Sequence, residues 1–564
     1  MSVRLALLAL LTAMLAACAP SNPDAQRADL IIRNGVIYDG SGGAAQRADL
    51  AVRGDRVAAV GDLKSWSATR LVDAAGLAVS PGFINMMCWS TESLIEDGRG
   101  LSDLVQGVTL GVMGEGFSMG PLTPAMKEDM VKKQTDIKYE INWTTLSEYL
   151  EFLQKRGVSM NVASYLGAAT VRVHELGEAN RAPTPEELAR MKKLVAQAME
   201  DGALGVASAL IYAPGFYART DELVALAQEA GKYGGGYASH LRSEGNQFLE
   251  ALEEFISITQ ASGGHGEVYH LKAAGKKNWP KMKQAIARIQ KARDQGLDIS
   301  ADMYTYPAGA TGLDASMPPW VQEGGLDQWV ERLKDPKIRK RVLREMRTPT
   351  DQWENLMLGA GTPDGLLLLG FREEKLKPLT GKTLGEVARL RGTSPEDTAI
   401  DLVIEDHSRV TTAYFLMSEE NVKLGLSQPW VSLNSDAESS APEGVFLKSS
   451  THPRAYGNFA RFLAKYVREE KVTTLSDGIR RMTQLPAQNL RLKDRGCLKP
   501  GCYADIVIFD ADKIQDHATF EKPLQLATGV RDVFVNGVQA LENGKATDAR
   551  PGRVVRGPGY KGDR

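Results

Sequence analysis

Apolar residues follow two alternating patterns through the middle of the chain. Between residues 81 and 487, short apolar runs alternate with stretches in which apolar residues recur every three or four positions. Short apolar runs are typical of buried parallel strands, and the longer periodic stretches are typical of amphipathic helices. The clearest predicted helix covers residues 185–199. Eight runs are predicted as strands: Phe83–Trp89, Val108–Met113, Asn161–Leu166, Leu204–Ala209, Gly236–His240, Glu267–Lys272, Asp298–Tyr304 and Trp430–Asp436.

Eight strand–helix units predict an α/β fold, a TIM-like (β/α)8 barrel, whose chemistry sits at the carboxyl ends of the strands. A further apolar run, Thr411–Met417, competes for the strand count and leaves the register of the last two strands open. Residues 313 to about 369 are rich in Trp, Lys and Arg and interrupt the alternation. They are interpreted as an inserted subdomain.

The two flanks of the barrel lack helical periodicity and consist of short β-type runs. They cover residues 28–80 and 488–556. Together they predict one small β-sandwich domain built from both ends of the chain.

The first residues have the pattern of an export signal. Residues 1–17 carry one arginine, Arg4, followed by an apolar run that is too short to cross a bilayer comfortably. The sequence Leu15-Ala-Ala-Cys18 resembles the bacterial lipobox, in which Cys18 is lipidated, and residues 18–27 would be a tether. An ordinary signal peptide with an incidental cysteine is the alternative. The expectation is an exported protein, lipid-anchored to the bacterial envelope and facing the periplasm.

Composition narrows the possible partners and excludes several classes. The chain has 564 residues, 43% of them hydrophobic, and a net charge of −2. This excludes intrinsic disorder and gives no electrostatic reason to expect nucleic acid. Membrane contact is expected only through the anchor. Cys497 and Cys502 flank a turn and either bridge a hairpin or are two small buried hydrophobic residues, the second being slightly favoured.

Polar side chains follow four of the predicted strands. Glu115 follows the second strand, His240 ends the fifth, His270 ends the sixth and Asp436 follows the eighth. In a closed barrel these four side chains meet at one rim. Two imidazoles and a carboxylate are a reasonable zinc site completed by water, and a neighbouring aspartate can take a proton from that water.

From Ala28 to about Arg556 the chain resembles the amidohydrolase superfamily, and within it the D-aminoacylases, or N-acyl-D-amino-acid deacylases. The block His452-Pro-Arg-Ala-Tyr-Gly457 is the most specific motif to that family. The other matching motifs are Ser80-Pro-Gly-Phe-Ile84, Gln106-Gly-Val-Thr109, Ala238-Ser-His-Leu-Arg242, His270-Leu-Lys272, Asn434-Ser-Asp436, and Lys499-Pro-Gly with Ala504-Asp505.

One departure from the family pattern changes the expected metal content. The family's His-x-His motif supplies two ligands of one metal, and here those positions are Met87 and Trp89. Cys88 between them faces the opposite way on a strand and is discounted. The family's bridging cysteine aligns with Glu115, which also suits zinc. The resemblance therefore implies one zinc per chain, held by Glu115, His240 and His270.

The resemblance also implies roles for the other residues. Asp436 is the general base and then the acid, and Lys272 and Tyr212 polarise the scissile carbonyl or fix the substrate. Arg454 grips the substrate carboxylate through a bidentate fork. His452 is interpreted as structural. The remaining histidines match no motif: His174, His265, His407 and His517.

Three functions follow from this pattern. The first is hydrolysis of the amide of an N-acyl-D-amino acid or a related D-configured peptide. The second keeps the chemistry but changes the small-molecule substrate to another N-blocked amide or dipeptide. The third, supported by the loss of His-x-His, is a non-catalytic lipid-anchored binding protein. Retention of His240, His270, Asp436, Lys272 and Arg454 argues against the third.

Overall fold

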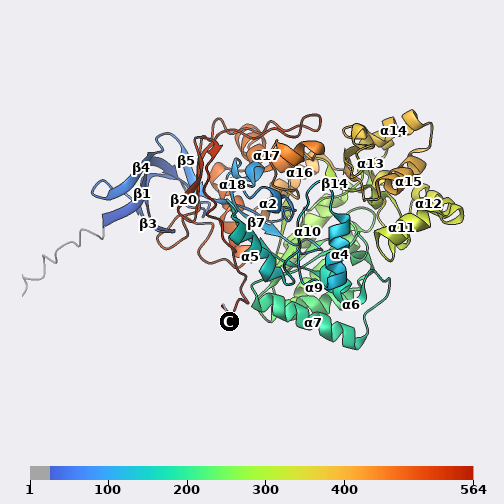
Figure 1. Cartoon of the computed structure of the whole chain (residues 1–564). Coiled ribbons are helices and arrows are strands. Elements are labelled where there is room, and N and C mark those ends of the chain that lie inside the picture. The colour runs from blue at the N-terminus through green and yellow to red at the C-terminus, as the bar shows by residue number, and fades with distance from the viewer. Residues whose placement is uncertain (1–25, 563–564) are drawn as a thin grey trace, which may run out of the picture.

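The central element of the computed structural model, which describes residues 26–562, is a closed parallel barrel. Figure 1 shows it between a β-domain at one end and a group of helices at the other. Its strands run in chain order: β6 (Phe83–Asn85), β7 (Val108–Met113), β8 (Asn161–Ser164), β9 (Leu166–Gly167), β10 (Gly205–Ala209), β11 (Gly236–His240), β12 (Gly266–Val268), β13 (Ile299–Met303) and β17 (Val431–Leu433).

Two features complete the barrel. One residue, Tyr165, separates β8 from β9, so that these two pieces occupy one strand position and the barrel has eight. The first and last strands are joined beyond their assigned ends, because the amide of Met86 donates to the carbonyl of Leu433 at 3.2 Å and that of Asp436 to Met87 at 3.1 Å. The predicted (β/α)8 barrel is confirmed.

Amphipathic helices cover the outside of the barrel. Helix α7 begins with a capping box, in which Thr184 and Glu187 each bond the other's backbone amide, and this fixes its start. The covering helices are α5 (Leu146–Arg156), α6 (Ala168–Leu176), α7 (Pro185–Glu200), α8 (Thr220–Gly231), α9 (Phe248–Ser262), α10 (Lys281–Asp294), α16 (Glu419–Leu426), α17 (Arg454–Arg461) and α18 (Leu475–Met482). Helix α4 (Pro124–Lys133) instead lines the cavity at the barrel mouth. Shorter helices are α2 (Ser93–Glu96), α3 (Leu101–Leu104) and α19 (Gln484–Asn489).

The strand alternation divides the core in two. On β11, Tyr237 packs in the outer cluster with the helices, whereas Ala238 belongs to an inner cluster with Ile84 and Leu110. His240 lies on the same face as Ala238, since side chains two apart share a face. The inner apolar cluster therefore lies inside the barrel, below the rim that carries His240.

Between β13 and β17 the chain leaves the barrel for a separate small sheet. The run that competed for a barrel position forms β16 (Thr411–Tyr414), which pairs antiparallel with β14 (Gly309–Gly312) and β15 (Leu366–Gly370). The helices α11 (Leu326–Lys334), α12 (Pro336–Arg347), α13 (Leu356–Ala360), α14 (Leu384–Arg391) and α15 (Pro395–Asp406) accompany it. This segment extends beyond the predicted range 313–369. That range was recognised by its content of Trp, Lys and Arg, which the strands of the segment do not share.

The two ends of the chain share one sheet of nine strands. The amino-terminal strands are β1 (Arg27–Ile37), β2 (Gln46–Arg53), β3 (Arg56–Gly61), β4 (Ser67–Asp73) and β5 (Ala78–Pro81), and the carboxyl-terminal strands are β18 (Ile506–Phe509), β19 (Val530–Val535), β20 (Val538–Glu542) and β21 (Lys545–Ala546). They meet where β5 pairs with β18. Apolar residues of both groups, such as Ile32 and Ile506, pack in one cluster.

The cysteine pair Cys497–Cys502 corrects a sequence expectation. The two residues form a disulfide, with 6.1 Å between their Cα atoms, and are not merely buried hydrophobic residues. The intervening turn brings the Cα atoms within the range that a disulfide requires, and the sequence pattern does not reveal this approach. Cys18, the predicted signal peptide and most of the tether lie outside the described residues. Within residues 26–562, no helix combines the length and apolar character needed to cross a membrane.

Candidate active site

Glu115 reaches the barrel rim because glycines flank it. Gly114 has φ +106°, and a Cβ there would lie 2.2 Å from the carbonyl oxygen of Tyr165. Only glycine fits this backbone. The sequence Met-Gly-Glu-Gly thus ends β7 with a turn in which Glu115, 3% exposed, lies inside the barrel mouth.

Glu115, His240 and His270 converge on one point, although the chain separates them widely. His270 Nε2 lies 2.9 Å from Glu115 Oε1 and 3.0 Å from His240 Nδ1, and His240 Nδ1 lies 3.4 Å from Glu115 Oε1. Ligands 2.0–2.1 Å from a tetrahedral zinc are about 3.3 Å apart. The three donor atoms therefore have nearly the spacing of a zinc site.

Burial and neighbouring charges around these residues also fit a metal. All three side chains are buried. Burial alone would raise the pKa of Glu115, but hydrogen bonds from His240 and His270 hold it well below its ordinary value. Glu115 is thus an anion in a closed site, which is the form that binds a cation. A carboxylate and two imidazoles suit zinc.

Glu244, which was not predicted as a site residue, contacts both histidines of the candidate metal centre. Its Oε1 lies 3.1 Å from His270 Nδ1, and its Oε2 lies 3.5 Å from His240 Nε2. Carboxylates commonly orient metal-binding histidines in this way. Glu244 stands four residues after His240 in Ser-His-Leu-Arg-Ser-Glu, and this proximity to a strand-end histidine was the available signal.

Lys272 joins this group through its ammonium. Its Nζ donates to Glu244 Oε1 at 2.6 Å and lies 2.7 Å from His270 Nδ1. Burial would lower the pKa of Lys272, but the Glu244 carboxylate, together with Tyr304 and Asp436, outweighs burial and raises that pKa. Lys272 is therefore a charged donor beside the candidate metal centre.

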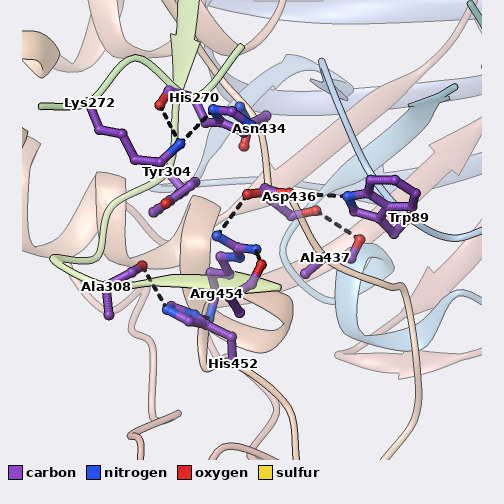
Figure 2. A network of polar contacts seen from close by, with 12 residues as sticks. Trp89, His270, Lys272, Tyr304, Ala308, Asn434, Asp436, Ala437, His452 and Arg454 are labelled. Carbon is purple, nitrogen blue, oxygen red and sulfur yellow. Dashed lines mark hydrogen bonds and ion pairs between the residues drawn. The ribbon is translucent and has the colours of Figure 1, made fainter. Parts of the chain in front are cut away.

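Asp436 lies between Trp89 and Arg454 on the same rim (Figure 2). Trp89 Nε1 donates to its Oδ1 at 3.1 Å, and Arg454 Nη1 lies 2.8 Å from its Oδ2. The Arg454 guanidinium also lies 4.4 Å from the centre of the Tyr304 ring. Arg454 is thus paired with Asp436 and is not a free guanidinium in the cavity.

Strained backbone positions and one buried aspartate fix the rim. His270 and Asp436 have φ +35° and +44°, which non-glycine residues seldom adopt. Asp302, directly before the end of β13, accepts from the His270 amide at 2.5 Å and from the Asn434 side chain. It therefore ties together the strand ends that carry His270 and Asp436. Asp302 was not among the predicted site residues.

The predicted site residues line one cavity of about 820 Å³. Tyr212 lies edge-on to His240, with 5.2 Å between the ring centres. Loss of solvation raises the pKa of the Tyr212 hydroxyl well above its ordinary value, so this group is a donor at neutral pH. The cavity walls contain Glu115, Tyr212, His240, His270, Lys272, Asp436 and Arg454, with residues of the small sheet such as Thr311 and Thr411.

His452 makes backbone contacts. Its Nε2 lies 3.0 Å from the Ala308 carbonyl, and its Nδ1 accepts from the Arg454 amide. Burial, with the nearby Arg454 charge, lowers its pKa well below the ordinary value, so it is neutral and anchors the start of α17. The other histidines bond elsewhere: His174 with Glu175, His265 with Glu267 and Asp298, His407 with Asp327, and His517 with Thr528.

Comparison with known proteins gives consistent matches. Residues 70–540 match the model described as "Amidohydrolase family". The chain is 31% identical over 539 residues to a D-aminoacylase from Alcaligenes xylosoxydans xylosoxydans, covering 95% of this chain and 99% of that one.

Two solved structures are similar over nearly their whole length. One is an N-acyl-D-glutamate deacylase from Bordetella bronchiseptica with zinc and a phosphonate inhibitor that mimics the tetrahedral intermediate, with 29% identity, a TM-score of 0.77, and 94% and 100% of the two chains covered. The other is a D-aminoacylase described by its binuclear metal centre, "one-metal activation and second-metal attenuation", with 30% identity, a TM-score of 0.78, and coverage of 94% and 99%.

Proposed function

Because the chain belongs to the amidohydrolase family, we propose that it is a metal-dependent hydrolase that cleaves the amide bond of N-acyl-D-amino acids. The products are a carboxylate and a free D-amino acid. One observation carries the proposal: a buried carboxylate–histidine–histidine cluster shares a cavity with a carboxylate, Asp436, that is not part of the cluster. A metal site beside a separate base is what hydrolysis by activated water requires.

Zinc is the metal that best suits Glu115, His240 and His270, and a bound zinc would acidify water and polarise a carbonyl oxygen. Asp436 then takes a proton from the attacking water and passes it to the leaving nitrogen. Its two oxygens contact Trp89 and Arg454, which keep the carboxylate in one orientation. One metal per chain is expected, since Met87 and Trp89 provide no substitute for two imidazoles.

Three further residues bind and orient the substrate in this proposal. Lys272 and Tyr212, a cation and a neutral hydroxyl beside the histidines, donate to the scissile carbonyl oxygen. Arg454 offers its guanidinium to the substrate carboxylate while it stays next to Asp436. The small sheet and its loops complete the cavity wall around the acyl group.

The test is a substrate screen with metal-loaded protein. N-acetyl-D- and N-acetyl-L-amino acids are compared as pairs, with release of the free amino acid as the readout. Hydrolysis of the D-forms, abolished by a chelator and restored by zinc, supports the proposal. A preference for the L-forms, or turnover that a chelator leaves unchanged, contradicts it.

We also propose that the protein is exported and anchored to the envelope by lipid on Cys18. The lipobox-like sequence supports this location, as does the Cys497–Cys502 disulfide, because such bonds persist in oxidising compartments. Membrane partition of the parent and release of a Cys18→Ser variant are the expected results. Equal recovery of both forms in the soluble periplasmic fraction would contradict the proposal.

A further inference from the structure

Trp89 stands at one of the two positions where the family resemblance places a metal ligand, and its backbone is fixed next to Asp436. The Asp436 amide donates to the Met87 carbonyl at 3.1 Å, and the Trp89 amide donates to the Ala437 carbonyl at 3.0 Å. These two bonds set the segments 87–89 and 436–437 side by side. The approach of the indole to the carboxylate is therefore imposed by the main chain.

The side-chain contact is specific to the indole N–H. Trp89 Nε1 donates to Asp436 Oδ1 at 3.1 Å, while Arg454 approaches the other oxygen, Oδ2. The indole hydrogen bond to one oxygen and the guanidinium charge beside the other oppose rotation of the carboxylate about its Cβ–Cγ bond. An indole is a donor only and cannot bind a metal through nitrogen. Trp89 is 37% exposed and lines the cavity, whereas Asp436 is 9% exposed.

We propose that Trp89 is a positioning residue for the base. Its indole N–H, together with Arg454, holds the Asp436 carboxylate in the orientation from which it takes the proton of water. At position 89 the resemblance implies a ligand of a metal ion, and this chain instead has a neutral hydrogen-bond donor that contacts the base. This inference rests on the proposed role of Asp436 in hydrolysis, but the contact itself is tested without turnover.

The first experiment observes the hydrogen bond directly. The eight tryptophans are labelled with ¹⁵N at the indole nitrogen, and the Trp89 signal is identified by its loss in Trp89→Phe. Because a carboxylate is a stronger acceptor than an amide, the Trp89 indole proton should move upfield in Asp436→Asn and further in Asp436→Ala. Trp320 donates to the Glu345 carboxylate at 2.7 Å in the inserted segment, and its signal should stay in place.

The second experiment measures the coupling of the two residues in catalysis. Trp89→Phe keeps an aromatic ring and removes the N–H. A hydrogen bond to a charged group corresponds to about a tenfold change in rate or more, so kcat should fall about tenfold with little change in KM. In the Asp436→Asn background the same substitution should change kcat less than about twofold, since coupled residues are not additive. Trp320→Phe, which also removes an N–H from a carboxylate, should change kcat less than about twofold in either background.

Each arm has a result that overturns the inference. If the chemical shift of the Trp89 indole proton is unchanged in both Asp436 variants, the hydrogen bond is absent. If Trp89→Phe lowers kcat equally in the parent and in the Asp436→Asn background, Trp89 has a packing role and does not position Asp436. If none of the N-acyl amino acids is hydrolysed by the parent, the proposed function fails, and the labelled spectra still decide whether Trp89 holds Asp436.

Discussion

Asp436 and Arg454 form an ion pair inside the cavity, with 2.8 Å between Oδ2 and Nη1 and with side chains 10% and 2% exposed. The family resemblance implies separate roles for them, one as base and one as carboxylate clamp. Their contact makes these roles interdependent, because a group that moves Arg454 away from Asp436 also removes the positive charge beside the base. In a buried pair, removal of one partner leaves the other charge uncompensated.

Substitution of Arg454 by lysine separates its two roles. Lysine keeps the charge but loses the planar fork that matches a carboxylate. We expect kcat/KM to fall further for substrates with a free α-carboxylate than for the corresponding amides. Steady-state kinetics on matched acid and amide pairs provides the measurement. A uniform loss across both series would mean that Arg454 acts only through Asp436 or the fold.

The metal content follows from the residues present at the rim. Purified protein should carry close to one zinc per chain, measured by elemental analysis, because the described cluster has three ligands and residues 87 and 89 are Met and Trp. Glu115→Ala and His270→Ala should each lose the metal, since two ligands hold zinc far less well than three. His452→Ala, which removes a histidine of the same cavity, should keep it. Two tightly bound metals per chain would contradict this account.

Much of the barrel could be predicted from the sequence because its strands are buried on both faces and appear as continuous apolar runs. The strand ends were harder. The runs Glu267–Lys272 and Trp430–Asp436 extend past β12 and β17, since His270 and Asp436 adopt left-handed backbone that the apolar pattern does not encode. These departures from regular strand lie at the site itself.

The supporting residues could not be predicted in the same way. Glu244 and Asp302 act through contacts between different strand ends, and only the folded barrel brings those ends together. Trp89 appeared in the sequence as a lost ligand, and its bond to Asp436 depends on the pairing of the first and last strands. The Cys497–Cys502 disulfide likewise depends on the geometry of the intervening turn, which the spacing of the two cysteines does not determine.

The inserted segment makes a pH-dependent contact with Glu244, a residue beside the candidate metal centre. Glu354 accepts from the Glu244 amide at 2.7 Å, and burial together with the Glu244 charge raises its pKa from 4.5 to about 7. As pH rises between these values the unfolded chain releases this proton first, so the contribution of Glu354 to stability falls. Tm should therefore decrease less from pH 4.5 to about 7.5 in Glu354→Gln than in the parent. Glu331→Gln, an exposed glutamate of the same segment, serves as control. Parallel Tm curves for Glu354→Gln and the parent would show that Glu354 does not titrate in this range.

The central claim, that metal-activated water and the Asp436 base hydrolyse an N-acyl-D-amino acid, is tested most directly by Asp436→Asn. This substitution keeps the size and much of the hydrogen bonding but removes the basicity. With zinc content equal to that of the parent, single-substrate turnover of the best N-acetyl-D-amino acid should fall by about 10²–10⁴-fold. Turnover at the parent rate by a zinc-loaded Asp436→Asn protein would contradict the account.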